Sequence, residues 1–113
     1  MEIISVEELV GEKKRFKLIT SEWGTKKIYR FGQPEGTTYI DGATARTRRN
    51  YLLRHMANRT EAHLINNNIP SPALFSAKLL WGDSPNLKEN IDELNLHFKL
   101  EWGMPTYGLR RPA

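Results

Sequence analysis

Arginine and lysine are the residue types in this sequence most able to do chemistry, and they are concentrated in one part of the chain. Residues 13–60 contain twelve basic residues against three acidic ones, whereas residues 1–12 contain four glutamates and no basic residue. Arginine suits phosphate because its planar guanidinium donates two parallel hydrogen bonds, and several such groups displace the counterions condensed on a duplex. We therefore predict a surface that binds a polyanion or an acidic partner, formed by Lys26, Lys27, Arg30, Arg46, Arg49 and Arg54.

A solvated helix surface is the competing interpretation of these arginines. On a helix, Arg46 and Arg54 fall far around the cylinder from Arg48 and Arg59, so not all of them can face one ligand. Some would then be structural and would pair with acidic residues of the carboxyl-terminal half, namely Glu89, Asp92 or Glu93.

Aromatic residues stand beside the basic ones and allow two interpretations of their own. Tyr29, Phe31 and Tyr39 could stack the bases of a single strand. Aromatic residues that alternate along a strand more often belong to the core, and this is the interpretation we favour.

Metal and thiol chemistry find little support. The sequence has no cysteine, which excludes disulfides, thiolate zinc sites and cysteine nucleophiles. His55, His63 and His97 lack the i, i+4 spacing and the third nearby ligand of a metal site. We predict no metal and no cofactor, and we expect His55 to pack beside Tyr51 with a hydrogen bond to a neighbour.

Catalytic carboxylates are equally hard to assemble from this sequence. Asp92 and Glu93 are adjacent on a predicted helix and point in different directions, and no phosphate-binding glycine loop or hydrolase motif occurs. We therefore predict that the protein is not an enzyme and has no catalytic residue. A small hydrolase or nuclease that uses Glu35, Asp41 and His55 is the remote alternative.

The elements that position these residues must fit into 113 residues, a length typical of one domain. Ser5 and Glu8 have capping-box spacing and predict a short helix near residues 5–10. Alternation of polar and apolar residues predicts a β-hairpin with strands near 14–20 and 26–31, and residues 37–40 predict a short third strand.

Three helices should follow the hairpin. Residues 43–58 contain no glycine or proline and predict a basic amphipathic helix. Ser71-Pro72 starts a buried helix that Gly82 ends, and Ser84-Pro85 repeats the same start signal. The sequence predicts an α+β fold in which an amino-terminal antiparallel hairpin or small sheet packs on about three helices. Its expected core contains Phe16, Leu18, Ile28, Leu52, Met56, Phe75, Leu79, Leu80, Ile91, Leu94 and Phe98.

The carboxyl-terminal residues differ in character from the rest. We expect a single domain over residues 1–100 and an irregular interaction tail over residues 101–113, which has two glycines and two prolines. Large apolar side chains in this tail favour a protein interface at Trp102, Met104, Tyr107 and Leu109. The alternative is that the tail folds back across its own helices.

Several segments occur in an order that resembles a known family. They are Arg30-Phe31-Gly32, Arg48 to Tyr51 to Arg54-His55, Pro72-Ala73-Leu74-Phe75-Ser76, Leu79-Leu80-Trp81-Gly82, and Leu87 to Ile91 to Phe98. Over roughly residues 14–98 the chain resembles a family of small uncharacterised proteins of large nucleocytoplasmic DNA viruses. The resemblance implies a viral origin and no assigned enzymatic activity, and it transfers no catalytic residue.

Two functions follow from these observations. The first is a non-enzymatic structural component of a large DNA virus particle, such as a minor capsid or core protein. Its tail would anchor it to viral structural proteins while its basic part faces an acidic surface, and it would be found in the virion, the host-cell cytoplasm or the viral factory. The second is a sequence-nonspecific nucleic-acid-binding accessory protein. We expect no membrane insertion and no small-molecule substrate.

Overall fold

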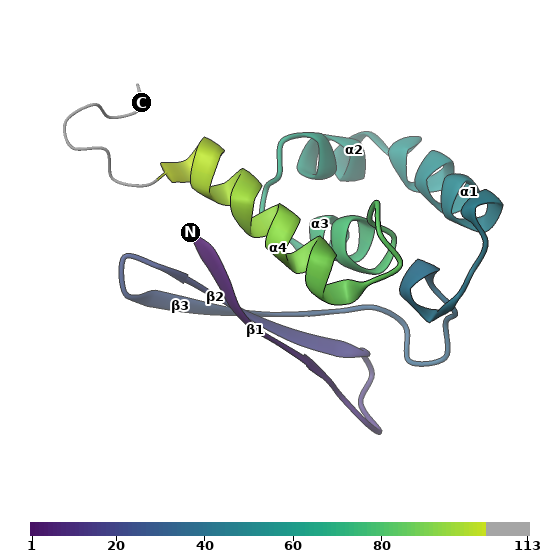
Figure 1. The fold of residues 1–113 in the computed structure, drawn as a ribbon, viewed down its shortest axis with the longest axis horizontal. Helices are drawn as coiled ribbons and strands as arrows, with labels where there is room; N and C mark the ends of the chain where they lie inside the picture. The colour runs from purple at the N-terminus through teal and green to yellow at the C-terminus, as the bar shows by residue number, and fades with distance from the viewer. Residues whose placement is uncertain (104–113) are drawn as a thin grey trace.

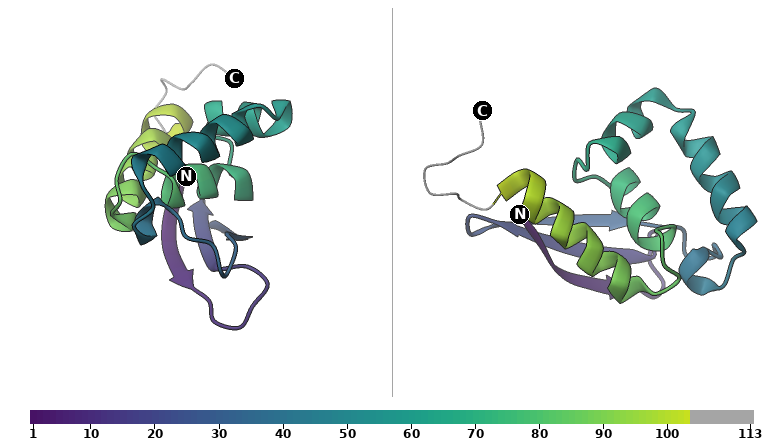
Figure 2. Two further views of the ribbon diagram at one scale, coloured as in Figure 1. Left: turned by 90° about the vertical axis from the view of Figure 1, so that its right-hand side faces the viewer. Right: turned by 45° about the horizontal axis from the view of Figure 1, so that its top comes forward.

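A three-stranded antiparallel sheet and a layer of helices on one of its faces make up the fold (Figure 1). The computed structural model describes residues 1–103. The strands β1 (Glu2–Glu8), β2 (Phe16–Glu22) and β3 (Thr25–Phe31) lie in the order β1-β2-β3. Figure 2 shows the helices gathered on a single side of the sheet, so no helix of residues 1–103 covers its other face, which we call the uncovered face. The α+β class that the sequence predicts is confirmed.

The first strand replaces the helix that we expected near residues 5–10. β1 pairs antiparallel with β2, with Ile3 opposite Thr20 and Val6 opposite Leu18. Branched side chains at residues 3, 4 and 6 favour a strand. Pairing with β2 also buries Ile3. The predicted helix was wrong because this long-range pairing outweighs the local capping signal of Ser5 and Glu8.

The predicted hairpin of β2 and β3 is confirmed. Its two-residue turn consists of Trp23 and Gly24, with φ angles of 52° and 81°. Positive φ at both positions is the type I′ geometry that matches the twist of the flanking strands. Phe16, Leu18 and Thr20 are buried and alternate with more exposed neighbours, so this side of β2 faces the helices.

A single turn of 3-10 helix, η1 (Tyr39–Asp41), occupies the place of the third strand that we expected over residues 37–40. The Asp41 carboxylate accepts hydrogen bonds from the Thr38 backbone N–H and hydroxyl, at 3.0 and 2.7 Å. These bonds close the chain into a turn, so the strand prediction was wrong.

The helices begin with α1 (Ala45–Met56), which confirms the predicted basic helix, and α2 (Arg59–Asn66), which the sequence analysis missed. The buried helix is α3 (Pro72–Phe75), which continues as a π-helical turn, η2 (Ser76–Leu80). Ser71 caps α3 as predicted, by accepting the Leu74 N–H. The last helix, α4 (Leu87–Phe98), begins after Asn86, whose side chain caps it in place of Ser84, and it continues as η3 (Lys99–Gly103).

The core lies between the sheet and the pair α3-η2 and α4. Seven of the predicted core residues are buried there, namely Phe16, Leu18, Phe75, Leu79, Leu80, Leu94 and Phe98. Leu52, Met56 and Ile91 are only partly buried. Ile28 is 53% exposed because its side chain lies on the uncovered face of the sheet, and Ile3, Phe31, Leu74 and Trp81 complete the core instead.

The predicted interaction tail lies almost wholly beyond the described part of the chain. The backbone of Trp102 belongs to η3, while Met104, Tyr107 and Leu109 lie outside the described residues. Between residues 1 and 103, no helix has the length and apolar character needed to cross a membrane.

Candidate functional site

The structure separates the six predicted binding residues into two groups. Lys26, Lys27 and Arg30 belong to β3, and the other three, Arg46, Arg49 and Arg54, belong to α1. The turn that precedes β3 and the helix α1 lie at opposite ends of the long axis of the molecule (Figure 1). The six residues therefore form two basic groups on different elements, and their binding of a polyanion or an acidic partner stays a prediction.

The α1 arginine surface consists of Arg46, Arg49 and Arg54, which are all exposed. No acidic residue occurs in α1, and none of the three forms an ion pair with any of residues 1–103. The Arg54 guanidinium lies over the ring of Tyr51 at 5.8 Å from its centroid. This contact keeps one end of the surface close to the body of the protein and leaves the charge open to solvent.

The opposite side of α1 faces inward and uses its own arginine for structure. Arg48 Nε donates to the carbonyls of Trp81 and Gly82, at 3.0 and 2.7 Å, and Nη2 contacts Asp83 at 2.9 Å. A Cβ at Gly82 would overlap the carbonyl of Lys78, so glycine permits the tight chain path that presents these acceptors. A structural arginine was foreseen, but its partner is Asp83, and the three predicted acidic partners bind other groups.

Arg15 is a second basic residue that the structure neutralises. Its guanidinium donates to Asp41 Oδ1 at 2.6 Å and to Glu8 Oε2 at 2.8 Å, which ties the loop before β2 to η1 and β1. The hydrogen bond from Arg15, helped by those from Thr38, holds the pKa of the Asp41 carboxyl well below its usual range. Asp41 is thus occupied by Arg15 and Thr38, which removes it from the catalytic role considered for the remote hydrolase alternative.

A ring stack connects α1 to the core beneath the arginine surface. The Tyr51 ring stacks on Trp81 at 4.3 Å and contacts His55 at 4.1 Å, and burial raises the pKa of the Tyr51 hydroxyl. His55 Nδ1 lies 2.9 Å from Glu61 Oε1. The prediction that His55 packs beside Tyr51 and bonds to a neighbour is confirmed.

A cleft of about 390 Å³ opens beside this stack, between residues 32–38, α1 and α3. Lys14 and Arg54 line it together with His55 and Glu61. Neither cation forms an ion pair with another residue of the range 1–103, and the one carboxylate of the lining already bonds a histidine, so the cleft favours an anionic group. Sequence reasoning missed Lys14 because no local pattern brings it to Arg54, which is 40 residues further along the chain.

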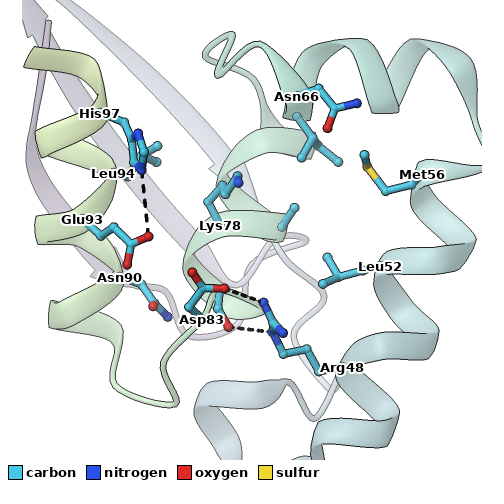
Figure 3. A pocket seen from close by; sticks show the side chains of 13 residues that line it. Arg48, Leu52, Met56, Asn66, Lys78, Asp83, Asn90, Glu93, Leu94 and His97 are labelled. Carbon is cyan, nitrogen blue, oxygen red and sulfur yellow. Dashed lines mark hydrogen bonds and ion pairs between the residues drawn. The ribbon is translucent and has the colours of Figure 1, made fainter. Parts of the chain in front are cut away.

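A smaller pocket of about 200 Å³ lies between α1, η2 and α4, and Figure 3 shows its lining. Leu52, Met56 and Leu94 form its apolar part. The polar groups of its rim largely contact one another: Arg48 forms an ion pair with Asp83, and His97 Nε2 lies 3.9 Å from the Glu93 carboxylate. Since these groups contact one another, the pocket offers a ligand less than the basic cleft does.

The aromatic residues considered for base stacking serve the core. Phe31 is buried and stacks on Phe16 at 5.6 Å, and Tyr29 meets Phe75 edge to face at 5.0 Å. The most exposed aromatic side chain of the described residues is instead Trp23, at 75%, in the hairpin turn. The sequence analysis did not single it out, although a tryptophan before a glycine between two strands was a visible signal.

The β3 basic edge consists of Lys26, Lys27 and Arg30, which are exposed and form no ion pair with other residues of the described range. Across the sheet, β1 carries Glu2, Glu7 and Glu8 and no basic residue. One edge of the sheet is thus acidic and the other basic. No group of three histidine, aspartate or glutamate side chains placed to hold a metal occurs among residues 1–103.

Comparison with known proteins gives one match. Residues 9–55 match a family of unknown function, DUF5754, over a segment that runs from the end of β1 nearly to the end of α1. No curated protein and no solved structure matches the chain. The matched segment contains all six residues of the α1 arginine surface and the β3 basic edge, so the chain is similar to this family where its basic character is concentrated.

Proposed function

We propose that this protein is a non-enzymatic accessory protein that binds nucleic acid without sequence specificity, through the α1 arginine surface. One observation carries the proposal. Arg46, Arg49 and Arg54 stay exposed and without an ion pair to any described residue, on a helix that has no acidic residue. Arg15 and Arg48, from the same basic segment, are neutralised by carboxylates.

The position of α1 supports this proposal. The helix lies at one end of the molecule, with its outward side clear of the sheet and of α4 (Figures 1 and 2). A helix of this kind fits the major groove of B-form DNA, where arginines reach the phosphates on both sides. The basic cleft beside Arg54 adds Lys14 to the same end of the molecule.

The role in a virus particle stays a prediction, together with its viral protein partners and its location in the virion or viral factory. Its proposed anchor, the tail, lies mostly outside the described residues. The observations on α1 therefore favour the nucleic-acid function.

Fluorescence anisotropy of a labelled 20-base-pair duplex, titrated at several salt concentrations, tests the proposal. The wild-type affinity should fall with log salt at a slope of about −0.9 for each phosphate contact. Replacing Arg46, Arg49 and Arg54 by glutamine should lower the magnitude of that slope by up to about 2.7, the share of three contacts.

The chain offers a control of equal charge. Replacing Lys26, Lys27 and Arg30 by glutamine removes the same three charges from β3 and should change the slope by less than about 1. The proposal is wrong if the wild type does not bind the duplex at low salt, or if the β3 variant loses as much as the α1 variant.

A further inference from the structure

β3 forms an edge of the sheet, and its outer main chain has no hydrogen-bond partner among residues 1–103. Glu22 and Thr25 flank the two-residue turn, and in such a hairpin the flanking pair exchanges hydrogen bonds. Bonded and non-bonded pairs then alternate along an antiparallel ladder. The residues of the non-bonded pairs, Lys26, Ile28 and Arg30, therefore direct their N–H and C=O groups away from β2.

The edge formed by β1 is closed by a side chain. Asn95 Oδ1 accepts the Ile3 N–H at 2.7 Å, and Asn95 Nδ2 donates to the Ile3 carbonyl at 3.1 Å. The amide of Asn95 thus takes both hydrogen bonds that a neighbouring strand would make with Ile3. A register irregularity between Ile3 and Ser5 further disrupts this edge.

No comparable device closes β3 among residues 1–103. The pairing of β3 with β2 is regular over all seven residues, and β3 contains no proline. No hydrogen bond joins the main chain of Lys26, Ile28 or Arg30 to another described residue outside the β2 ladder. The lysine and arginine side chains of β3 disfavour pairing with a neutral or basic strand, but its regular, open main chain remains a template for a strand of opposite charge.

Charge decides which strand can occupy the edge. Two copies of this protein joined through β3 would place lysine and arginine side chains against one another, which is unfavourable. The acidic β1 of a second copy has the right charge, but Asn95 and the irregularity obstruct its edge. The complementary occupant is an acidic segment of a different protein.

We propose that β3 is a docking edge for an extended acidic peptide of a partner protein, which adds to the sheet as a fourth strand. Main-chain bonds to Lys26, Ile28 and Arg30 would supply affinity, and the basic side chains would select acidic residues. Ile28, 53% exposed between them, offers an apolar contact on the uncovered face. This surface is independent of the α1 arginine surface, so either proposal can fail alone.

Binding of synthetic peptides to the full chain tests the proposal. The probe is a labelled, acetylated and amidated heptapeptide of alternating glutamate and valine, measured by anisotropy at about 50 mM salt. Two matched probes serve as controls. In the first, lysine replaces each glutamate. In the second, every second residue is N-methylated, on the side of the peptide that would pair with β3. The first keeps the strand propensity without the acidic charge, and the second keeps the charge without the N–H donors.

The acidic peptide should bind, and each matched probe should bind at least about tenfold more weakly. In NMR spectra the amides of Lys26, Ile28 and Arg30 should shift and become protected from exchange. The proposal is overturned by any of three results. The first is that the acidic peptide does not bind at concentrations up to about 1 mM. The second is that the N-methylated probe binds as tightly as the unmodified peptide. The third is that a stoichiometric amount of duplex displaces the bound peptide.

A pair of variants at one position provides a check from the protein's side. The N–H of Ile28 points away from β2, so Ile28→Pro removes a donor from the edge and leaves the β2 ladder intact. Ile28→Pro should weaken peptide binding about tenfold more than Ile28→Ala does, at unchanged circular dichroism. If Ile28→Pro fails to fold, the comparison of the N-methylated and unmodified probes decides the question alone.

Discussion

The α1 arginine surface and the β3 basic edge carry similar charge but differ in what accompanies it. On α1 the main-chain hydrogen bonds are internal to the helix, so only side chains can reach a ligand. On β3 the main chain itself forms no hydrogen bond along one side with any residue that the structure describes. A charged helix suits a regular lattice of phosphates, whereas an open strand edge requires a partner with a polypeptide backbone. The two proposals thus assign chemically distinct partners to the two parts of the basic segment.

Charge reversal on α1 should have the largest effect that distinguishes the two surfaces. The double variant Arg46→Glu, Arg49→Glu removes two contacts and adds repulsion, so duplex affinity at low salt should fall about a hundredfold. Binding of the acidic heptapeptide should change less than about threefold, because both substitutions lie on α1 and leave the main chain and side chains of β3 unchanged. Anisotropy with both ligands measures the two effects, and a parallel loss of both would show that the surfaces act as one.

Adjacent arginines on α1 should differ in what they do for stability. Arg48→Gln leaves the carbonyls of Trp81 and Gly82 and the Asp83 carboxylate without their donor, so the free energy of unfolding should fall by about 2 kcal/mol. Arg49→Gln, on the exposed side, should change it by less than about 0.5 kcal/mol. Urea denaturation measures both, and equal effects would contradict the division of α1 into a structural and a binding side.

Local sequence patterns were sufficient for the hairpin, α1 and the buried helix after Ser71, because alternation, helix period and capping are encoded by neighbouring residues. They were insufficient for β1, whose strand state depends on pairing with β2 and on Asn95, 92 residues away. The residue types of the candidate surfaces were also predictable. Helix geometry also separated Arg48 from Arg46 and Arg54, but the partner of the structural arginine was not predictable, because it depends on where Trp81 and Asp83 lie.

Acid should weaken the structural pairing that removes Arg15 from the binding surfaces. Because the folded-state pKa of Asp41 is depressed, its contribution is present above the unfolded value of about 4 and is lost as the pH falls below it. Asp41→Asn should therefore cost about 1 kcal/mol at pH 7 and progressively less below pH 4. Urea midpoints at pH 7 and pH 2.5 measure this, and a pH-independent cost would contradict the ionic role of Asp41.

The smallest expected effect concerns the hairpin turn beside the β3 basic edge. Trp23 has a φ of 52°, which costs a bulky residue free energy, and its side chain is 75% exposed. Asparagine tolerates this conformation in type I′ turns, so Trp23→Asn should raise the free energy of unfolding by about 0.5 kcal/mol. A gain in stability combined with weaker binding of the acidic heptapeptide would show that Trp23 contacts the added strand at its end. An unchanged peptide affinity would confine the docking edge to the residues from Lys26 to Arg30, where charge and unpaired main chain coincide.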